Sequence, residues 1–508
     1  MSDLSTAESE GFGGGAPKGS LSTAESGGFG GGAPKGWELV VGLEVHCELA
    51  TNTKMFCGCA NSFDTEPNTN ICPVCLGLPG SLPVINQTAV EYAIRIGSAL
   101  NCTVVPSTFH RKNYFYPDMT KDYQVSQYDQ PINVNGYLDL PNGTRIGIER
   151  AHMEEDAGKS SHKGGSGRIA GADYSLVDYN RAGVPLVEIV SRPDIRSSED
   201  ARIYASELRA ILIATGASDG KMEEGSMRVD ANVSVRRYGD ELGTRAEVKN
   251  VNSLRSLQRA IEYEAARQID LLEAGGKIVQ ETRHWSEADG RTSSMRSKEE
   301  ANDYRYFTEP DLVPMSPSPA WVAEIAAALV PMPAARRIAL SEATGGELAP
   351  SSDPVVTVVD QGLDTLVLAA VAKGAPARSA INRAANELGS AGASVISALS
   401  VDSFAAILVM EADGKLTATQ AKQVLAEVLA SGGDPVAIAK SRGFEAMESG
   451  AAEGLVDQLI AAHPAEFQRL KDGDPKIAGF FVGAAMKLSG GKADGKAITA
   501  LLRAAAGL

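Results

Sequence analysis

The sequence has no long apolar run. Its longest apolar stretches, such as residues 323–331, are far shorter than the roughly 20 residues that a membrane-spanning helix needs, and no apolar signal-peptide core stands at the N-terminus. We therefore expect a cytoplasmic protein with no membrane partner. An excess of positive charge is also absent, because 48 basic and 64 acidic side chains leave a net charge of −16. This balance excludes a protein that coats nucleic acid through general electrostatics.

A nucleic-acid partner is still possible where basic residues gather locally. One such place is the segment from residue 471 to residue 508, which holds six basic and three acidic side chains. The sequence also has no Walker-type glycine-rich loop. Residues 159–167 (KSSHKGGSG) are the nearest substitute for a phosphate-binding loop, but their composition slightly favours a mobile surface loop.

A chain of 508 residues is too long for one hydrophobic core, and this length predicts about two to four domains. Residues 4–36 contain a near-perfect tandem repeat, whose copies differ internally only at Glu10 and Gly27. The repeat is rich in glycine, serine and alanine and cannot bury enough apolar surface to fold. We therefore predict that residues 1–36 are a disordered head.

Residues 37–315 mix strand and helix patterns. Residues 39–49 and 227–236 alternate apolar and polar side chains, as half-buried strands do. Amphipathic helices are predicted over residues 199–215 and 254–274, each with a polar cap before it and glycine after it. Strands and helices do not alternate strictly, so the pattern favours an α+β fold with an antiparallel or mixed sheet over a doubly wound sheet.

The second half of the sequence is different in composition. Residues 313–319 are proline-rich and indicate a linker. Beyond them the sequence is rich in alanine and almost wholly helical in pattern. We predict a helical domain over residues 316–442 and a second, smaller helical domain over residues 443–508, so that two all-α domains follow the α+β domain.

Four of the six cysteines form a cluster with the spacing C-x-C-x12-C-x2-C. They are Cys57, Cys59, Cys72 and Cys75. Two close pairs on tight turns can bring four thiolates around one tetrahedral Zn²⁺. Without an export signal, a metal site is favoured over two disulfides, and four free thiols are the other alternative. Such a zinc site would be structural, because four sulfur ligands leave no open position for a substrate.

Acidic side chains recur on the polar faces of the predicted strands. Glu44 and His46 lie side by side on the first strand, and Asp230 and Glu247 lie on later strands. Residues 152–156 (HMEED) add three acids beside a glycine-rich basic loop. Together these carboxylates could form an oxygen-rich site for Mg²⁺ and ATP phosphates. The alternative is that each is only the exposed face of a half-buried strand.

Longer motifs resemble a known family. The segments are residues 42–46 (GLEVH), 53–56 (TKMF), 78–86 (LPGSLPVIN), 150–159 (RAHMEEDAGK), 178–190 (DYNRAGVPLVEIV), 224–232 (EGSMRVDAN), 247–253 (EVKNVNS) and 303–307 (DYRYF). They closely resemble the B subunit of bacterial aspartyl/glutamyl-tRNA amidotransferases. The C-terminal motifs FFVGAAMK and GGKAD are similar to the YqeY-like tail of that family. The resemblance covers about residue 37 to the end, and only the duplicated head departs from it.

The resemblance implies a cradle-like catalytic domain that binds ATP, Mg²⁺ and the acceptor end of misacylated Glu-tRNA(Gln) or Asp-tRNA(Asn). The side-chain carboxylate of the attached amino acid is phosphorylated, and ammonia then displaces phosphate to form the amide. The resemblance further implies that an amidase chain, the A subunit, supplies the ammonia from glutamine and that a small C subunit completes a heterotrimer. The cognate synthetase is a further candidate partner. The sequence has no amidase signature, so we expect the chain to be inert with glutamine alone.

The family motifs also imply site residues. Six fall on catalytic segments: Glu44, His46, Glu154, Glu155, Asp230 and Glu247. Those assigned to Mg²⁺ are Glu44, His46, Glu155 and Glu247. Glu154 and Asp230 are assigned to a second metal, ammonia passage or orientation. Lys159 and Lys249 are candidates for phosphate contacts. The candidate tRNA-binding residues are Lys487, Lys492 and Lys496. The four clustered cysteines match members of the family that carry zinc.

Three other functions stay open at this point. The chain could be a zinc-dependent nucleic-acid-binding module, which Mg²⁺-dependent ATP turnover would exclude. It could be a carboxylate kinase or ligase for a small molecule, which a requirement for charged tRNA would exclude. It could also be a structural scaffold, in which mutation of Glu155 or Glu247 would affect stability alone.

Overall fold

The computed structural model describes residues 34, 36–62, 65–164, 172–297, 304–389, 399–444, 449–472, 474, 477–489, 493 and 495–507. The predicted head lies outside the described residues, apart from Pro34 and Gly36. The chain divides into two compact units. The first comprises Met1–Gly42, Ile195–Arg202 and Asp230–Lys298, and the second comprises Leu43–Asp194, Ile203–Val229 and Glu299–Leu508.

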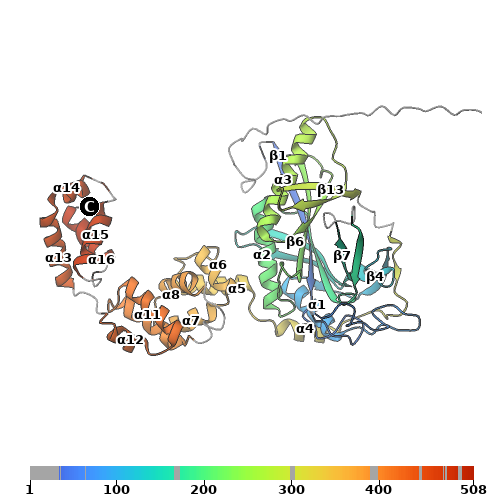
Figure 1. The fold of residues 1–508 in the computed structure, drawn as a ribbon, viewed down its shortest axis with the longest axis horizontal. Helices are drawn as coiled ribbons and strands as arrows, with labels where there is room; N and C mark the ends of the chain where they lie inside the picture. The colour runs from blue at the N-terminus through green and yellow to red at the C-terminus, as the bar shows by residue number, and fades with distance from the viewer. Residues whose placement is uncertain are drawn as a thin grey trace, which may run out of the picture. The chain divides into compact units, whose positions relative to one another are not determined.

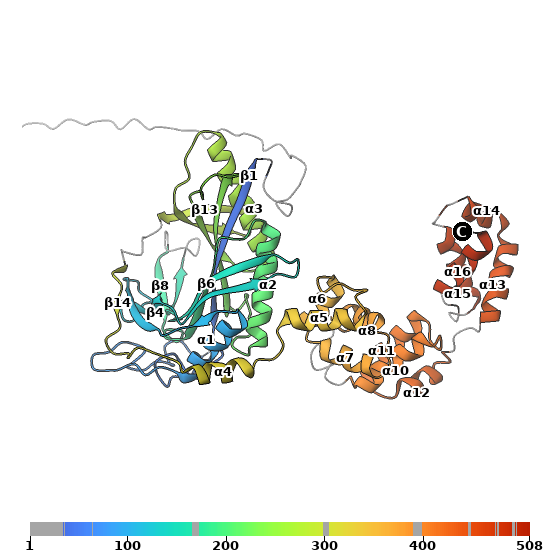
Figure 2. The ribbon, with the colours of Figure 1, turned by 180° about the vertical axis from the view of Figure 1, so that it is seen from behind.

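The first unit contains a sheet and one long helix. Its strand order is β13 (Arg291–Ser297), β12 (Glu281–Ser286), β11 (Ala246–Val251), β10 (Met227–Arg237) and the start of β1 (Trp37–Glu48). Helix α3 (Leu254–Glu273) packs against β11 and β13 (Figures 1 and 2). It begins at Ser253, whose hydroxyl accepts a hydrogen bond from the Ser256 amide. The alternating burial along β10 and the bounds of α3 confirm the patterns seen in the sequence.

The second unit contains the sheet that carries the candidate site. From the end of β1 its strand order is β9 (Pro185–Ser191), β6 (Arg145–Glu155), β4 (Tyr123–Gln130), β3 (Thr108–Asn113) and β14 (Phe307–Thr308). Strand β5 (Asn133–Asp139) pairs with β6 and with β2 (Thr103–Val104). These pairs are antiparallel.

Two helices accompany these strands. Helix α1 (Gln87–Ala99) begins at Asn86, whose side chain accepts two backbone hydrogen bonds, and it packs against β5 and β6. Helix α2 (Ser198–Ala214) has its first residues in the first unit and the rest in the second. It confirms the helix predicted over residues 199–215.

From residue 319 onward the described residues form helices, turns and bends. The helices are α4 (Pro319–Ala327), α5 (Pro333–Ala343), α6 (Asp353–Asp360), α7 (Asp364–Ala372), α8 (Ala377–Arg383), the π-helix η3 (Ala384–Leu388), α10 (Val401–Ala412), α11 (Ala418–Ser431), α12 (Pro435–Ser441), α13 (Ser449–Ala462), α14 (Pro464–Lys471), α15 (Ile477–Leu488) and α16 (Gly495–Ala506). They bury two separate hydrophobic clusters, one between Leu340 and Ala439 and the other between Ala452 and Leu502. A mixed sheet followed by helices confirms the α+β class.

Two further observations concern expectations from the sequence. Lys159–Lys163 forms strand β7, which pairs antiparallel with β8 (Tyr174–Asp178), so the loop interpretation of residues 159–167 is wrong for its first five residues. The backbone of this segment pairs with a partner strand, and local composition does not reveal such a pairing.

Within the described residues, no single helix is both long and apolar enough to cross a membrane. Only the pair α6 and α7, bent by 109° at its break, passes when the two are joined.

Candidate active site: a histidine–carboxylate cluster on three strands

Three neighbouring strands place polar side chains in one row across the sheet. Strand β9 lies between β1 and β6, and its Glu188 is paired with His46 of β1 on one side and with His152 of β6 on the other. Directly opposed residues of antiparallel strands point to the same face. Glu154 is two residues beyond His152 on β6 and therefore points to that face as well. The row thus gathers two imidazoles and two carboxylates.

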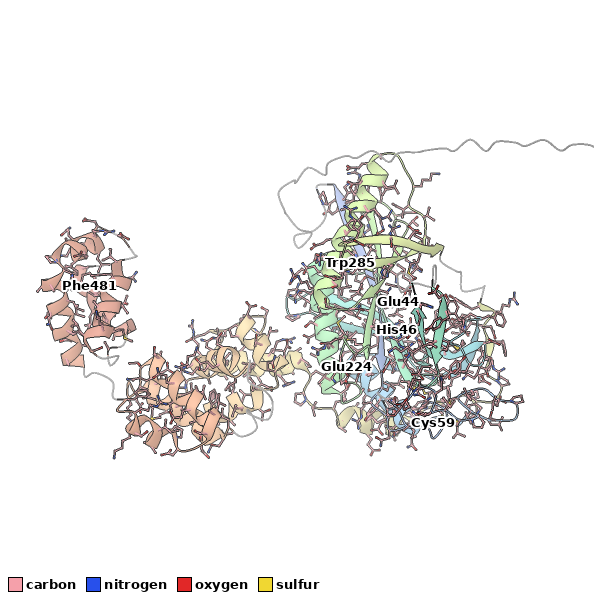
Figure 3. The ribbon with its side chains drawn as sticks, viewed as in Figure 1. Glu44, His46, Cys59, Glu224, Trp285 and Phe481 are labelled. Carbon is pink, nitrogen blue, oxygen red and sulfur yellow. The ribbon has the colours of Figure 1, made fainter. Side chains whose placement is uncertain are left out.

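Three of these side chains could hold one ion. His46 Nε2 lies 3.5 Å from Glu154 Oε1 and 3.7 Å from Glu188 Oε2. The ligand atoms of the three residues all lie within 4.8 Å of one another. Glu44 precedes His46 by two residues on β1 and therefore shares its face; both residues are labelled in Figure 3.

The electrostatics of the row favour a bound cation. Burial, reinforced by the charge of Glu188, raises the pKa of Glu154 to about 8. Burial lowers the pKa of His152 well below its usual value, so this imidazole is neutral. A divalent cation among His46, Glu154 and Glu188 would relieve the repulsion between the two carboxylates. One imidazole and two carboxylates are a donor set that divalent ions accept, so the residues fit such an ion.

A second charged group lies at the end of the same strands. Asp156, just after β6, receives the Arg228 guanidinium at 2.8 Å and that of Arg181 at 3.4 Å. Burial, followed by the charge of Asp156, raises the pKa of Glu48 to about 7. Two arginines beside these acids place positive charge where an anionic substrate could be bound.

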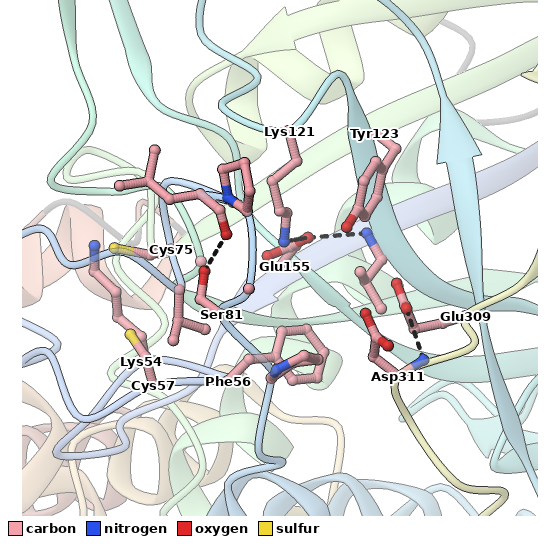
Figure 4. Close-up of a pocket in the computed structure, with 18 residues that line it drawn as sticks. Lys54, Phe56, Cys57, Cys75, Ser81, Lys121, Tyr123, Glu155, Glu309 and Asp311 are labelled. Carbon is pink, nitrogen blue, oxygen red and sulfur yellow. Dashed lines mark hydrogen bonds and ion pairs between the residues drawn. The ribbon is translucent and has the colours of Figure 1, made fainter.

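Glu155 lies apart from the row, because consecutive strand residues point to opposite faces. Its carboxylate forms an ion pair with Lys121 and accepts a hydrogen bond from the Val125 amide at 3.0 Å. The pair lines a cavity of about 200 Å³ (Figure 4). Tyr123 and Lys54 line the same cavity.

The first unit holds a separate charged cluster on β10 and β11. Lys249 Nζ lies 2.7 Å from Asp230 Oδ2 and 3.2 Å from Glu247 Oε1. The Thr282 hydroxyl donates to Glu247 Oε2 at 2.9 Å. The structure therefore brings together the three residues that the sequence placed on the later polar strand faces.

The remaining candidate lysines are not gathered into a site. Lys159 is exposed at the start of β7. Lys487 is exposed near the end of α15. Lys492 lies outside the described residues, and so does the side chain of Lys496. Their contacts with phosphate or tRNA stay predictions.

The four clustered cysteines converge as their spacing predicts. The sulfurs of Cys57, Cys59, Cys72 and Cys75 lie within 4.8 Å of one another, and none forms a disulfide. The Cys72 amide donates to Cys75 Sγ at 3.1 Å, and a hydrogen bond from the Cys57 thiol lowers the pKa of Cys75 to about 5. Four convergent sulfurs with a thiolate-stabilising amide fit a tetrahedral metal such as Zn²⁺.

Reasoning from the sequence missed several residues of these sites, and Glu188 and Lys121 are two that the argument depends on. Glu188 and Lys121 were not among the candidates, although Glu188 lies inside one of the family motifs. A signal was present: Glu188 is the single acid in PLVEIVS, a strand whose other residues are buried. An acid in the middle of a buried strand is costly and needs a partner. Lys121 lies in an irregular segment, where no periodicity identifies it.

Comparisons with known proteins show which chains this one resembles. A family model described as the GatB/GatE catalytic domain matches residues 39–323, and one described as a GatB domain matches residues 366–505. A relative from Salinispora arenicola is 49% identical over 483 residues, covering 92% of this chain and 96% of the relative. A relative from Carboxydothermus hydrogenoformans is 48% identical over 477 residues, covering 92% and 98%. Both are named as the B subunit of an aspartyl/glutamyl-tRNA(Asn/Gln) amidotransferase.

Proposed function

Since this chain belongs to the family of aspartyl/glutamyl-tRNA(Asn/Gln) amidotransferase B subunits, we propose that it activates a carboxylate carried by tRNA. It is one chain of a ligase-type transamidase. The γ-phosphoryl group of ATP is transferred to the side-chain carboxylate of the attached Glu or Asp. This leaves ADP and a mixed anhydride whose phosphate is a good leaving group. Ammonia attacks the carbonyl carbon, the C–O bond to phosphate breaks, and loss of a proton gives the amide.

The observation that carries this proposal is the row formed by His46, Glu154 and Glu188. These three side chains would hold a divalent cation, Mg²⁺ in the cell, which when bound neutralises charge on the nucleotide phosphates. The sheet fixes their spacing through the paired register of β1, β9 and β6. Arg228 and Arg181, beside Asp156, are placed to bind an anionic part of the substrate. Lys159 and Lys249 stay candidates for the phosphates.

We assign the delivery of ammonia to the separate cavity on the Glu155 side of β6, which is the side opposite the row. It is lined by the Lys121–Glu155 pair on one side and by Cys57 and Cys75 on the other. A small, partly enclosed space admits ammonia while limiting bulk water, which would otherwise hydrolyse the anhydride. Zn²⁺ on the four cysteines would stabilise this wall without taking part in the chemistry.

The proposal includes partners. A chain without amidase chemistry needs another chain to release ammonia, so we place it in a heterotrimer with an amidase (the A subunit) and a small third chain (the C subunit). The helical tail, with Lys487, Lys492 and Lys496, would contact the tRNA body through phosphate charges. The name carried by the relatives, which makes each of them one subunit of an enzyme, supports a complex of several chains.

Phosphate release from γ-labelled ATP tests the kinase step. The chain, reconstituted with its amidase and small partner chains and Mg²⁺, is given Glu-tRNA(Gln), uncharged tRNA(Gln) or no tRNA. We expect release only with the charged tRNA. Glu188→Gln should reduce it about 1000-fold, since loss of a metal ligand removes several kcal/mol from transition-state stabilisation.

The matched control is Glu91→Gln. Glu91 forms a half-exposed ion pair with Arg95 on α1, so its loss should leave the rate unchanged. Phosphate release that is the same with charged and uncharged tRNA would favour a small-molecule ligase. An intact complex that releases no phosphate would favour a nucleic-acid-binding or scaffold role.

A further inference from the structure

His152 is a buried polar side chain that the proposed reaction does not use. It lies on β6 with none of its surface exposed. Neither of its ring nitrogens makes a hydrogen bond of good geometry within the described part of the chain. Leaving a buried polar group unsatisfied costs about 1–3 kcal/mol. We therefore expect this histidine to form a hydrogen bond in another state of the site, such as the state with a bound cation.

The position of the ring indicates that function. His152 Nε2 lies 3.5 Å from Glu188 Oε2 and 4.0 Å from Glu154 Oε2. The other oxygen of Glu154, Oε1, faces His46 at 3.5 Å. The Glu154 carboxylate is therefore bracketed, with one oxygen directed to His46 and the other to His152. Glu188 lies between the two imidazoles in the paired row.

His152 itself is not placed as a ligand. The group of ligand atoms within 4.8 Å of one another comprises His46, Glu154 and Glu188, and His152 does not belong to it. Its ring is also fixed from the side by an edge-to-face contact with Tyr128, at 6.2 Å between centroids. Tyr128 is in turn held by stacking on Tyr306 at 5.2 Å. These contacts leave the ring little freedom to turn toward an ion.

We propose that His152 is a positioning residue, whose Nε2–H holds the Glu188 and Glu154 carboxylates in the orientation that binds the divalent cation. Residues that hydrogen-bond to metal ligands fix ligand orientation, and their loss typically weakens metal binding by about 10–100-fold. His152 Nε2 lies 3.5 Å from Glu188 Oε2, so a small shift of the carboxylate in the cation-bound state would let the imidazole donate a hydrogen bond and would satisfy it. This inference rests on the proposed function, in which His46, Glu154 and Glu188 bind a divalent cation.

Mn²⁺ binding to the full complex tests the inference, with paramagnetic resonance as the readout. We expect His152→Leu to weaken Mn²⁺ affinity by about 10–100-fold. The conservative His152→Gln retains an N–H donor and should weaken it less, and it carries the test if the leucine variant does not fold. The matched control is His110→Leu, because His110 is also buried and lies 3.5 Å from the Asp129 carboxylate, outside the row.

A second reading of the same spectra counts coordinated imidazole nitrogens. One nitrogen is expected in the wild type and in His152→Gln, and none in His46→Ala. Two nitrogens in the wild type would make His152 a ligand and overturn the positioning role. Equal Mn²⁺ affinity in the wild type and in both His152 variants would overturn it too. If the wild type has no Mn²⁺ site that depends on His46, the proposed function of the row fails, and that result is separate from the other two.

Discussion

The thiolate cluster and the histidine–carboxylate row are two candidate metal sites in one unit, built in opposite ways. The four cysteines come from 19 consecutive positions, Cys57 to Cys75, and two turns suffice to assemble them. The row takes its members from β1, β6 and β9, which span more than a hundred residues and meet only when the sheet has formed. One site is local and closed by four sulfurs. The other is non-local and places the buried Glu154 carboxylate beside the partly buried carboxylate of Glu188, so that the two repel each other.

The difference between the two sites indicates that one contributes to stability and the other to catalysis. Four sulfurs around one ion leave no open coordination position for a substrate. The thiolate site can therefore contribute to the stability of the fold but not to catalysis. Buried carboxylates without a cation cost free energy, as the raised pKa of Glu154 shows. Such strain is kept where function requires it. We therefore expect changes in the row to affect the rate and changes in the thiolate site to affect stability.

The largest expected effect comes from Glu154→Gln. Removing this ligand should lower charged-tRNA-dependent phosphate release about 1000-fold. The same change removes a buried carboxylate whose neutral form is already favoured, so the melting temperature without metal should stay the same or rise. Phosphate release and thermal unfolding, measured on one preparation, check both parts. A large fall in melting temperature would show that the row is structural and would remove the contrast with the thiolate site.

The second effect is on stability and comes from Cys72→Ser. If the free metal concentration is about 1000 times the dissociation constant, loss of the site costs about 4 kcal/mol of unfolding free energy. At low temperature, the rate of phosphate release that depends on charged tRNA should be close to that of the wild type. Metal content and thermal unfolding, with and without a chelator, measure the loss. A fall in the rate of phosphate release without a change in melting temperature would contradict this prediction and would show that the thiolate site takes part in the chemistry.

The two sites also differ in how far the sequence predicts them. The cysteine spacing alone identifies the thiolate site, because a short closed motif has few possible geometries. The polar face of Glu44 and His46 was readable from strand alternation. The pairing of His46 with Glu188 was not, because strand register depends on the tertiary arrangement. Glu154 and Glu155, neighbours in one motif, point to opposite faces because strand side chains alternate. Which of the two faces His46 and Glu188 depends on the strand register, which the sequence does not show.

A third, smaller effect concerns the cavity that is lined by Cys57, Cys75 and the Lys121–Glu155 pair. Lys121→Met would leave the buried Glu155 carboxylate without its cation, and removing one partner of a buried pair costs about 3 kcal/mol. Adding Glu155→Gln to that variant should recover most of the loss. Chemical unfolding of the two single variants and the double variant gives the coupling free energy. A coupling near zero would mean that the pair does not shape this wall.

The smallest effect is expected at Gly183, which lines the cavity between Cys75 and Glu155. A Cβ there would lie 3.6 Å from Cys75 Cβ, 3.7 Å from Lys54 Cδ and 3.9 Å from Glu155 Oε2, all ordinary contacts. The cost of Gly183→Ala therefore comes from its φ of +85°, which disfavours a side chain by about 1 kcal/mol. The melting temperature should fall by about 2–4 °C, with metal content unchanged.

Gly225→Ala is the matched control for that change. Gly225 has nearly the same φ, +86°, and a Cβ there would have no neighbour within 4 Å. Equal losses in the two variants would mean that backbone strain is the whole effect and that the thiolate turn and the Glu155 wall tolerate a methyl group between them. A larger loss at Gly183, with lower metal content, would show that the cysteine turn is packed so tightly against Glu155 that a methyl group between them disturbs the metal site.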